Sequence, residues 1–223
     1  MTKPTEPTHR PKRSLAALGI AGALAAVAAV YVIVGPDGNS NGSQSCALSM
    51  ETAKNIKPFA TGEVAAFLPA QNPLPLNAIS FKTPNGEPIS ISAFNGRTIL
   101  MNLWATWCAP CRKEMPALDQ LQADLGDDTF EVVAVNMDRG GSEKPKAFLN
   151  EIGVTNLKFY HDASNKLMTD LRAKGRATGL PTTILVGPDG CEVGTMYGPA
   201  EWASGEAKAL VESALKTKKA PGS

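Results

Sequence analysis

Two cysteines, Cys108 and Cys111, lie within the segment LWATWCAPCRKEMPAL and are separated by two residues. Such a pair can ligate a metal, form a structural crosslink or act as a redox centre. A closed zinc site needs four ligands, but no second CxxC is present, His9 lies near the N-terminus and His161 is expected alone in a loop. Haem attachment needs a histidine directly after the second cysteine, where Arg112 stands. A crosslink that closes so short a loop removes little entropy from the unfolded chain, so a purely structural role is also disfavoured.

The residues around the pair favour redox chemistry. Cys108 follows the apolar segment 98–104, which is predicted to be a strand buried on both faces, and it precedes a helix expected from about Pro110. Unpaired N–H groups and the positive end of the helix dipole favour a thiolate at Cys108. A fall in the thiol pKa from about 8.5 to about 7 would make this sulfur a nucleophile at neutral pH. Cys111 lies one turn further on, so we expect it to be shielded and to attack the mixed disulfide that Cys108 forms.

The elements that position these cysteines follow from hydrophobic periodicity and turn residues. Strands are predicted at 79–91 (a hairpin around Asn85-Gly86), 98–104, 130–138 and 181–198 (a hairpin around Pro188-Asp189-Gly190). Helices are predicted from about 110, with Pro116 as a kink, and at 142–153, 165–175 and 201–216, with one or two short helices in 46–69 capped by Ser49 and Thr61. Strands that alternate with helices predict an α/β fold with a central mixed sheet flanked by helices on both faces.

Composition limits the class of protein. The chain has 223 residues, 43% hydrophobic and 19% charged, with a net charge of +1. The folded region has no basic block, which argues against a nucleic-acid partner. Residues 15–34 carry no charge, and twenty residues at about 1.5 Å each span roughly 30 Å, the thickness of a bilayer core. We therefore expect a cytoplasmic tail at 1–14, a transmembrane anchor at 15–34, a flexible linker at 35–45, a domain at 46–218 and a disordered tail at 219–223.

The N-terminal charges predict the orientation of this anchor. Residues 1–14 carry four basic residues against one acid, so they should stay in the cytoplasm and the domain should lie outside, in the periplasm of a Gram-negative source. A cleaved signal peptide with a site at Ala26–Ala28 is the alternative. Cysteines in such an oxidising compartment are usually paired, so we expect a structural disulfide between Cys46 and Cys191 rather than two free buried thiols. This bond is expected to resist reduction, on the argument that no helix dipole favours its thiolates.

Three motifs resemble the thioredoxin superfamily. WCAPC matches its active site, Pro116 matches its helix kink, and TGLPTTILV matches the segment that carries its cis-proline. The resemblance implies a thioredoxin-like fold, a cis peptide bond at Pro181 that belongs to the catalytic centre, and substrate contacts by Trp107, Gly179 and Leu180. It implies no cofactor beyond the redox-active disulfide Cys108–Cys111, and no metal.

Within the superfamily, NLWATWCAPCRKEMPAL is similar to the membrane-anchored periplasmic thiol:disulfide interchange proteins of the TlpA, ResA and CcmG type. The anchor and the additional cysteine pair resemble TlpA most. Asn102 stands where cytoplasmic thioredoxins have a buried acid, whereas Glu114 matches a glutamate of the ResA-like members. Glu114 is therefore a candidate catalytic residue, although a solvated acid in the first turn of a helix is the alternative.

The resemblance implies a protein-disulfide reductase in the cytoplasmic membrane whose catalytic domain faces the periplasm. Its partners would be exported proteins with CxxC or paired cysteines, such as apocytochrome c, a copper chaperone or an oxidase subunit, and its electron donor would be a membrane thiol reductase. An oxidant that introduces disulfides and a redox-inert chaperone or binding module are the alternatives. The intact CxxC favours an enzyme, and the plain Ala109-Pro110 dipeptide gives no indication of an oxidant.

Overall fold

The computed structural model describes residues 46–217. The tail, anchor and linker expected within 1–45 lie outside the described residues, as do residues 218–223. Within residues 46–217, no helix has both the length and the apolar character needed to cross a bilayer. The expectations for the N-terminal segment therefore remain predictions from the sequence.

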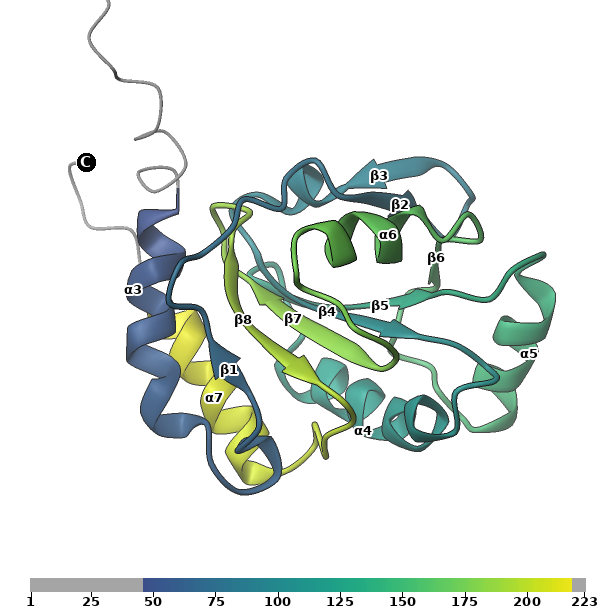
Figure 1. The fold of residues 1–223 in the computed structure, drawn as a ribbon. Helices are drawn as coiled ribbons and strands as arrows, with labels where there is room; N and C mark the ends of the chain where they lie inside the picture. Colours follow the sequence, from purple (N-terminus) through teal and green to yellow (C-terminus); the bar gives the residue numbers. More distant parts are fainter. Residues whose placement is uncertain (1–45, 218–223) are drawn as a thin grey trace, which may run out of the picture. The chain divides into compact units, whose positions relative to one another are not determined.

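An eight-stranded mixed sheet forms the centre of the described domain, in the order β1-β8-β7-β4-β5-β6-β2-β3 (Figure 1). Its strands are β1 (Leu68–Pro69), β2 (Ser80–Lys82), β3 (Pro88–Ser90), β4 (Thr98–Trp104), β5 (Phe130–Asn136), β6 (Tyr160–His161), β7 (Thr182–Val186) and β8 (Glu192–Tyr197). The pairs β4–β5 and β5–β6 are parallel, and the remaining pairs are antiparallel. The expected mixed sheet is thus confirmed.

Helices cover both faces of this sheet (Figure 1). They are α3 (Ala47–Ile56), α4 (Ala109–Leu125), α5 (Glu143–Glu151), α6 (Lys166–Ala173) and α7 (Gly205–Lys216), with the 3-10 turns η1 (Lys57–Phe59), η2 (Gly62–Val64) and η3 (Ile91–Phe94). Buried side chains of α3, α4, α5 and α7 form one hydrophobic cluster with one face of the sheet. Buried side chains of α6 and η3 form a second cluster on the other face.

Strand β4 connects the two clusters and leads into the CxxC motif. All seven of its residues are buried. Because side chains alternate along a strand, Leu100 and Trp104 belong to the cluster on the α4 side, whereas Ile99, Met101 and Leu103 belong to the cluster on the α6 side. Asn102 is two residues from Leu100, so both side chains are on the same face of the strand. The polar side chain of Asn102 therefore points into the core under α4.

The main elements lie where the sequence predicts them, and two strands were missed. The hairpin around Asn85-Gly86 forms as β2 and β3, and Gly86 has the positive φ of +84° that this turn requires. Strand β4 and helix α4, with Pro116 inside it, also match the prediction. The strands β1 and β6 each have only two residues, which is too short for an alternating pattern to be recognised.

The predicted helix cap at Ser49 is wrong, whereas Ser142 and Thr61 occupy N-cap positions without a side-chain capping bond among the described residues. Cys46, not Ser49, is the N-cap of α3, and Ser49 lies inside that helix. Ser142 does occupy the N-cap of α5, but within residues 46–217 its side chain makes no capping hydrogen bond. Thr61 precedes η2 in extended conformation and likewise makes no side-chain cap among the described residues. The position of Ser49 before an apolar run did not predict its role, because Ser49 makes a buried contact with a distant part of the chain.

The contact made by Ser49 lies beside the second disulfide. This disulfide joins Cys46 to Cys191 across 145 positions. The Ser49 hydroxyl donates to the Cys191 carbonyl oxygen at 3.1 Å, and the Ser49 N–H donates to Asp189 Oδ2 at 3.0 Å. The bond therefore fastens the start of α3 to the turn between β7 and β8. Strand β1, which follows in the same N-terminal extension, pairs with the outer edge of β8 and so covers an edge that would otherwise expose unpaired backbone groups.

Candidate active site

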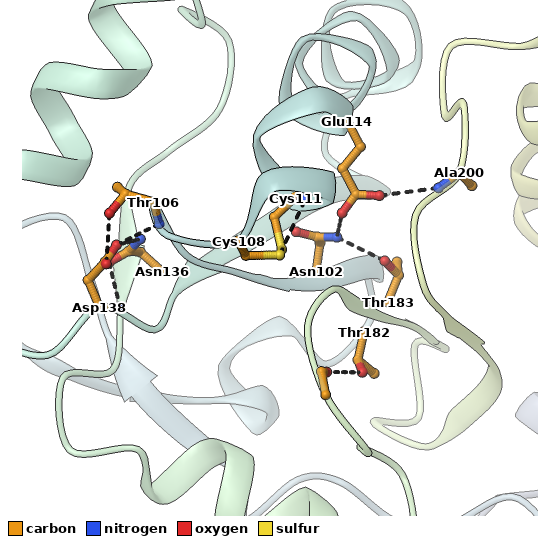
Figure 2. Close-up of a disulfide and its surroundings, with 11 residues drawn as sticks. Asn102, Thr106, Cys108, Cys111, Glu114, Asn136, Asp138, Thr182, Thr183 and Ala200 are labelled. Atoms are coloured by element: carbon orange, nitrogen blue, oxygen red, sulfur yellow. Dashed lines mark hydrogen bonds between the residues drawn. A yellow bond between two sulfur atoms is a disulfide. The ribbon is translucent and has the colours of Figure 1, made fainter.

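The cysteines of the CxxC motif lie at the start of α4, joined as a disulfide in the structure (Figure 2). Cys108 is the N-cap residue, and Pro110 occupies the first turn, where its missing N–H leaves no bond unmade. The Cys111 N–H donates to Cys108 Sγ over 3.3 Å. Cys108 is 6% exposed and Cys111 is fully buried. The first cysteine is thus the accessible one, at the positive end of the helix, and the second is shielded, as expected.

A buried hydrogen-bond network holds the loop that precedes Cys108. Asp138 accepts from the N–H and the hydroxyl of Thr106, at 3.0 and 2.8 Å, and from Asn136 Nδ2 at 2.7 Å. His161 Nε2 contacts the Asp138 carbonyl oxygen at 3.0 Å. His161 is therefore a buried residue of β6 rather than a surface residue in a loop, and that prediction was wrong. Because these four residues come from three segments, their spacing in the sequence gave no indication of the network.

Glu114 lies one turn beyond Cys111 and is only 3% exposed. Asn102 Nδ2 donates to its Oε1 at 2.9 Å, and the Ala200 N–H donates to its Oε2 at 3.3 Å (Figure 2). Burial penalises the charged carboxylate more than these bonds stabilise it, so the pKa of Glu114 rises from 4.5 to about 7. Glu114 is therefore not a solvated first-turn acid.

Asn102 links this carboxyl to the neighbouring strand. Its Nδ2 also donates to the Thr183 hydroxyl on β7 at 2.9 Å, while its own Oδ1 is buried without a hydrogen-bond partner among the described residues. The indole N–H of Trp202 approaches the Glu114 carboxyl without reaching hydrogen-bond geometry. The sequence indicated that Asn102 replaces an acid, but not that its amide would contact Glu114. A lone amide in the apolar run of β4 was the available signal.

The segment before β7 also contributes to the site. The Leu180–Pro181 peptide bond is cis, as the resemblance implies, and the Thr182 hydroxyl donates to the Gly179 carbonyl oxygen at 2.7 Å. Pro181 is buried, whereas Trp107 is 68% exposed. Trp107, Gly179 and Leu180 line one groove of about 730 Å³. The structure thus brings together the three residues expected to contact substrate.

The remaining candidates have structural or solvated positions. Trp104 and Trp202 are fully buried. Lys113 is exposed, and the Arg112 guanidinium lies 4.7 Å from the centre of the Phe148 ring. Among residues 46–217 no group of three or more His, Cys, Asp or Glu side chains is arranged to hold a metal ion.

The model of the family described as Redoxin matches residues 69–211, which is more than half of the chain and contains the whole site. The chain belongs to the Redoxin family. This redoxin is 35% identical over 124 residues to the thioredoxin-like protein YneN of Bacillus subtilis, covering 52% of this chain and 68% of YneN. It is 31% identical over 116 residues to the thiol-disulfide oxidoreductase ResA of Bacillus subtilis, covering 51% of this chain and 60% of ResA.

The fold agrees with solved structures. A crystal structure from Chlorobium tepidum, described as a DsbE-type thiol:disulfide interchange protein, superposes with a TM-score of 0.52 at 25% identity and covers 61% of this chain and 92% of that chain. The described domain therefore has the thioredoxin-like α/β fold and belongs with the thiol-disulfide oxidoreductases of the ResA and DsbE type. The alignments span about three fifths to two thirds of the two Bacillus relatives.

Proposed function

We propose that the domain is a thiol:disulfide reductase that acts on exported proteins at the outer face of the cytoplasmic membrane. The observation that carries the proposal is the arrangement of Cys108, Cys111 and Glu114. A nucleophile stands at the start of a helix, its partner is fully buried one turn later, and a buried carboxyl with a pKa of about 7 follows on the next turn. Trp107, which directly precedes the nucleophile, lines a groove together with Gly179 and Leu180.

The reduced domain would transfer two electrons in two exchange steps. The Cys108 thiolate attacks one sulfur of a partner's disulfide, a bond forms between Cys108 and that sulfur, and the partner's other sulfur leaves as a thiolate. Cys111 then loses its proton and attacks Cys108 Sγ, which releases the partner's first sulfur as a second thiolate. The partner is reduced, and the domain is left with the Cys108–Cys111 disulfide seen in the structure.

Glu114 is suited to the proton transfer of the second step. Cys111 and Glu114 are three residues apart on α4 and lie on successive turns, both near Asn102 (Figure 2). A carboxyl with a pKa of about 7 is partly ionised at neutral pH, so it can accept the Cys111 proton and later release it.

The surroundings of the pair support a reductant. An oxidant of this fold stabilises its reduced, thiolate form. Here the ionisable group next to Cys111 is an acid, whose charge disfavours a second negative charge nearby. The cation closest in sequence, Arg112, lies over Phe148 instead.

The partners and location follow from the resemblance to the anchored interchange proteins, TlpA in particular. The uncharged segment 15–34, with basic residues before it, supports a single-pass anchor with the domain in the periplasm. Exported proteins with paired cysteines, such as apocytochrome c, a copper chaperone or an oxidase subunit, are the proposed substrates. A membrane thiol reductase is the proposed electron donor.

The equilibrium reduction potential of Cys108–Cys111, titrated in glutathione and dithiothreitol buffers, tests the direction of electron flow. We expect a value more negative than about −200 mV, in the range of thioredoxins and glutaredoxins. A value near about −120 mV, like that of DsbA, would make the domain an oxidant. A pair that cannot be reduced without unfolding the domain would favour the redox-inert alternative.

Location and substrates need experiments in cells. Alkaline phosphatase fused after Ser45 should be active, and the full-length chain should sediment with membranes. Recovery of a soluble mature chain that begins near Ala29 would instead support a cleaved signal peptide. Partners trapped by a Cys111→Ser variant, released with reductant and identified by mass spectrometry, would distinguish cytochrome substrates from copper proteins.

A further inference from the structure

The groove beside the CxxC motif extends well beyond the residues that the motif explains. One end is formed by Trp107, which directly precedes Cys108, and by Leu180, which precedes the cis-proline. From there the groove continues between the loop after β5, the first turn of α5 and one side of α6. Its volume of about 730 Å³ lies within the range of roughly 300–1,000 Å³ typical of ligand sites. A polypeptide in this groove would therefore begin next to the nucleophile.

Three cations line this groove, and each comes from a different segment. Arg139 lies in the loop after β5, Lys144 in the first turn of α5, and Arg172 near the end of α6. All three are exposed. Within residues 46–217 none of them is in an ion pair, since the five pairs found there involve other cations. Arg172 donates a hydrogen bond to the Thr178 carbonyl oxygen at 3.3 Å, a neutral partner that does not cancel its charge. The charge of all three cations is therefore available to a ligand.

The acids nearby do not neutralise this charge. Asp138 is the one carboxylate in the lining of the groove, but it is 7% exposed and both of its oxygens accept bonds from Thr106 and Asn136. Asp170 is paired with Lys166 on the next turn of α6, and Glu143 does not line the groove. The groove carries a formal charge of +2 from three cations and one acid, whereas the whole chain carries only +1.

The rest of the lining suits a polypeptide rather than a bare anion. Met137, Met168 and Pro145 are buried and form an apolar floor between the cations. Asn165, at the start of α6, presents an amide for which no hydrogen bond is found within the described residues, and it has a positive φ of +61°. Apolar surface, a free amide and separated cations match an extended segment that carries both apolar and acidic side chains.

We infer that this groove recognises an acidic segment of the partner polypeptide, next to the partner's reactive cysteine, through Arg139, Lys144 and Arg172. The inference rests on the proposed reductase function and specifies its substrate class. Carboxylates of the partner would pair with the three cations while its disulfide lies over Cys108. Opposite charges accelerate encounter and fix the register of a complex, so acidic partners would react faster than neutral ones.

Matched peptides test the inference. Two peptides contain the same intramolecular CxxC disulfide, one flanked by glutamates and the other by glutamines. The rate constant for their reduction by the reduced, full-length protein is divided by the rate with uncharged dithiothreitol, which corrects for the effect of glutamate on the peptide's own sulfurs. At low ionic strength we expect the acidic peptide to react at least tenfold faster. The ratio should fall toward one in about 1 M salt, where the Debye length is about 3 Å.

Variants of the three cations locate the effect. Replacing Arg139, Lys144 and Arg172 together by glutamine should bring the ratio of acidic to neutral rates close to one, whereas Arg139→Lys with Arg172→Lys should retain most of it because the charge is kept. The matched control replaces three exposed lysines of α3, η1 and α7 by glutamine, namely Lys54, Lys57 and Lys216, and should leave the ratio unchanged. An acidic peptide without cysteines should compete with the acidic substrate.

The outcomes separate this inference from the proposed function. Equal corrected rates for the two peptides with the wild-type protein would overturn the inference while leaving the reductase intact. A preference that survives in the triple glutamine variant, or that disappears in the control variant, would also overturn it, because the charge would then act elsewhere. Failure to reduce either peptide would contradict the reductase function itself.

Discussion

The first cysteine of each disulfide in this domain is the N-cap residue of a helix, but the two bonds differ in exposure and in sequence separation. Cys46 is the N-cap of α3 and Cys108 is the N-cap of α4. The expectation that no helix dipole acts on the Cys46–Cys191 bond was therefore wrong. Cys46 is nevertheless 1% exposed, and Cys191 is fully buried in a distant turn. The two bonds therefore share a helix N-terminus and differ in the exposure of their sulfurs and in sequence separation, which is 145 for one and 3 for the other.

The acids beside the two disulfides differ in the same way. Asp189 accepts from the Ser49 N–H at 3.0 Å and from the Cys191 N–H at 3.3 Å, so donors surround it. Glu114 is buried with fewer donors, and its pKa rises to about 7. Asp189 thus holds the turn before Cys191 against the start of α3, whereas Glu114 is a buried carboxyl with a raised pKa.

The largest expected effect is on disulfide reduction, and it distinguishes Cys108 from Cys111. Cys108→Ser should abolish insulin reduction, because the accessible nucleophile is lost. Cys111→Ser should also stop turnover but accumulate mixed disulfides with partners, because the resolving sulfur is missing. Non-reducing gels followed by mass spectrometry measure the adducts. If the adducts form in the Cys108 variant instead, the two roles are reversed and the helix-dipole argument fails.

Removal of the Cys46–Cys191 disulfide should lower the stability of the fold rather than the rate of disulfide reduction. Closing a loop across 145 positions stabilises by up to about 5 kcal/mol in the chain-entropy model, against about 2 kcal/mol for the short loop of the CxxC motif. Cys46→Ala with Cys191→Ala should therefore lower the free energy of unfolding by more than Cys108→Ala with Cys111→Ala. Urea denaturation measures both. If the variant without Cys46 and Cys191 still reduces insulin at nearly the wild-type rate, the Cys46–Cys191 bond has a structural role. Loss of insulin reduction in that variant would contradict this role.

The two bonds should open at different potentials. The difference of about 3 kcal/mol between the two loops corresponds to roughly 60 mV for a two-electron couple. Cys108–Cys111 should open first, at the higher potential, because it is the more accessible pair and closes the shorter loop. A redox titration with mass-tagged alkylation and peptide mapping resolves the steps. A single step that involves all four cysteines, or free thiols at Cys46 and Cys191 in the exported protein, would remove the distinction.

The raised pKa of Glu114 can be tested through the pH dependence of stability. Because Glu114 has a raised pKa in the folded state, the folded chain binds more protons than the unfolded chain between pH 4.5 and about 7, and stability falls as the pH rises through that window. A shift of this size corresponds to about 3 kcal/mol. Glu114→Gln should remove this fall when oxidised protein is unfolded in urea at pH 4.5 and pH 7.5.

Glu51→Gln, at an exposed position of α3, is the matched control and should retain the wild-type fall. The same Glu114→Gln variant should slow the attack by Cys111 most strongly near neutral pH, as seen in longer-lived mixed disulfides. An unchanged pH profile for both stability and mixed-disulfide lifetime would show that Glu114 has no role in proton transfer.

Local sequence was sufficient for the longer elements and for the position of the CxxC pair before a helix. The apolar run of β4, the hairpin turn at Asn85-Gly86 and the position of Cys108 before a helix depend on neighbours a few residues away. Backbone propensity, side-chain alternation and helix capping act over that same range. The expected order of reactivity of Cys108 and Cys111 therefore rests on the residues next to them in the chain.

Only the tertiary structure decided which distant groups meet. The pKa of Glu114 depends on its burial beneath Ala200 and beside Asn102, and the loop before Cys108 depends on Asp138 and His161. The three groove cations come from separate segments. Such contacts depend on how helices and strands pack, and a spacing pattern within one segment contains no information about the segment that will cover it. The sequence determined which residue types stand along α4, and packing determined the burial of Glu114 and the groove beside the site.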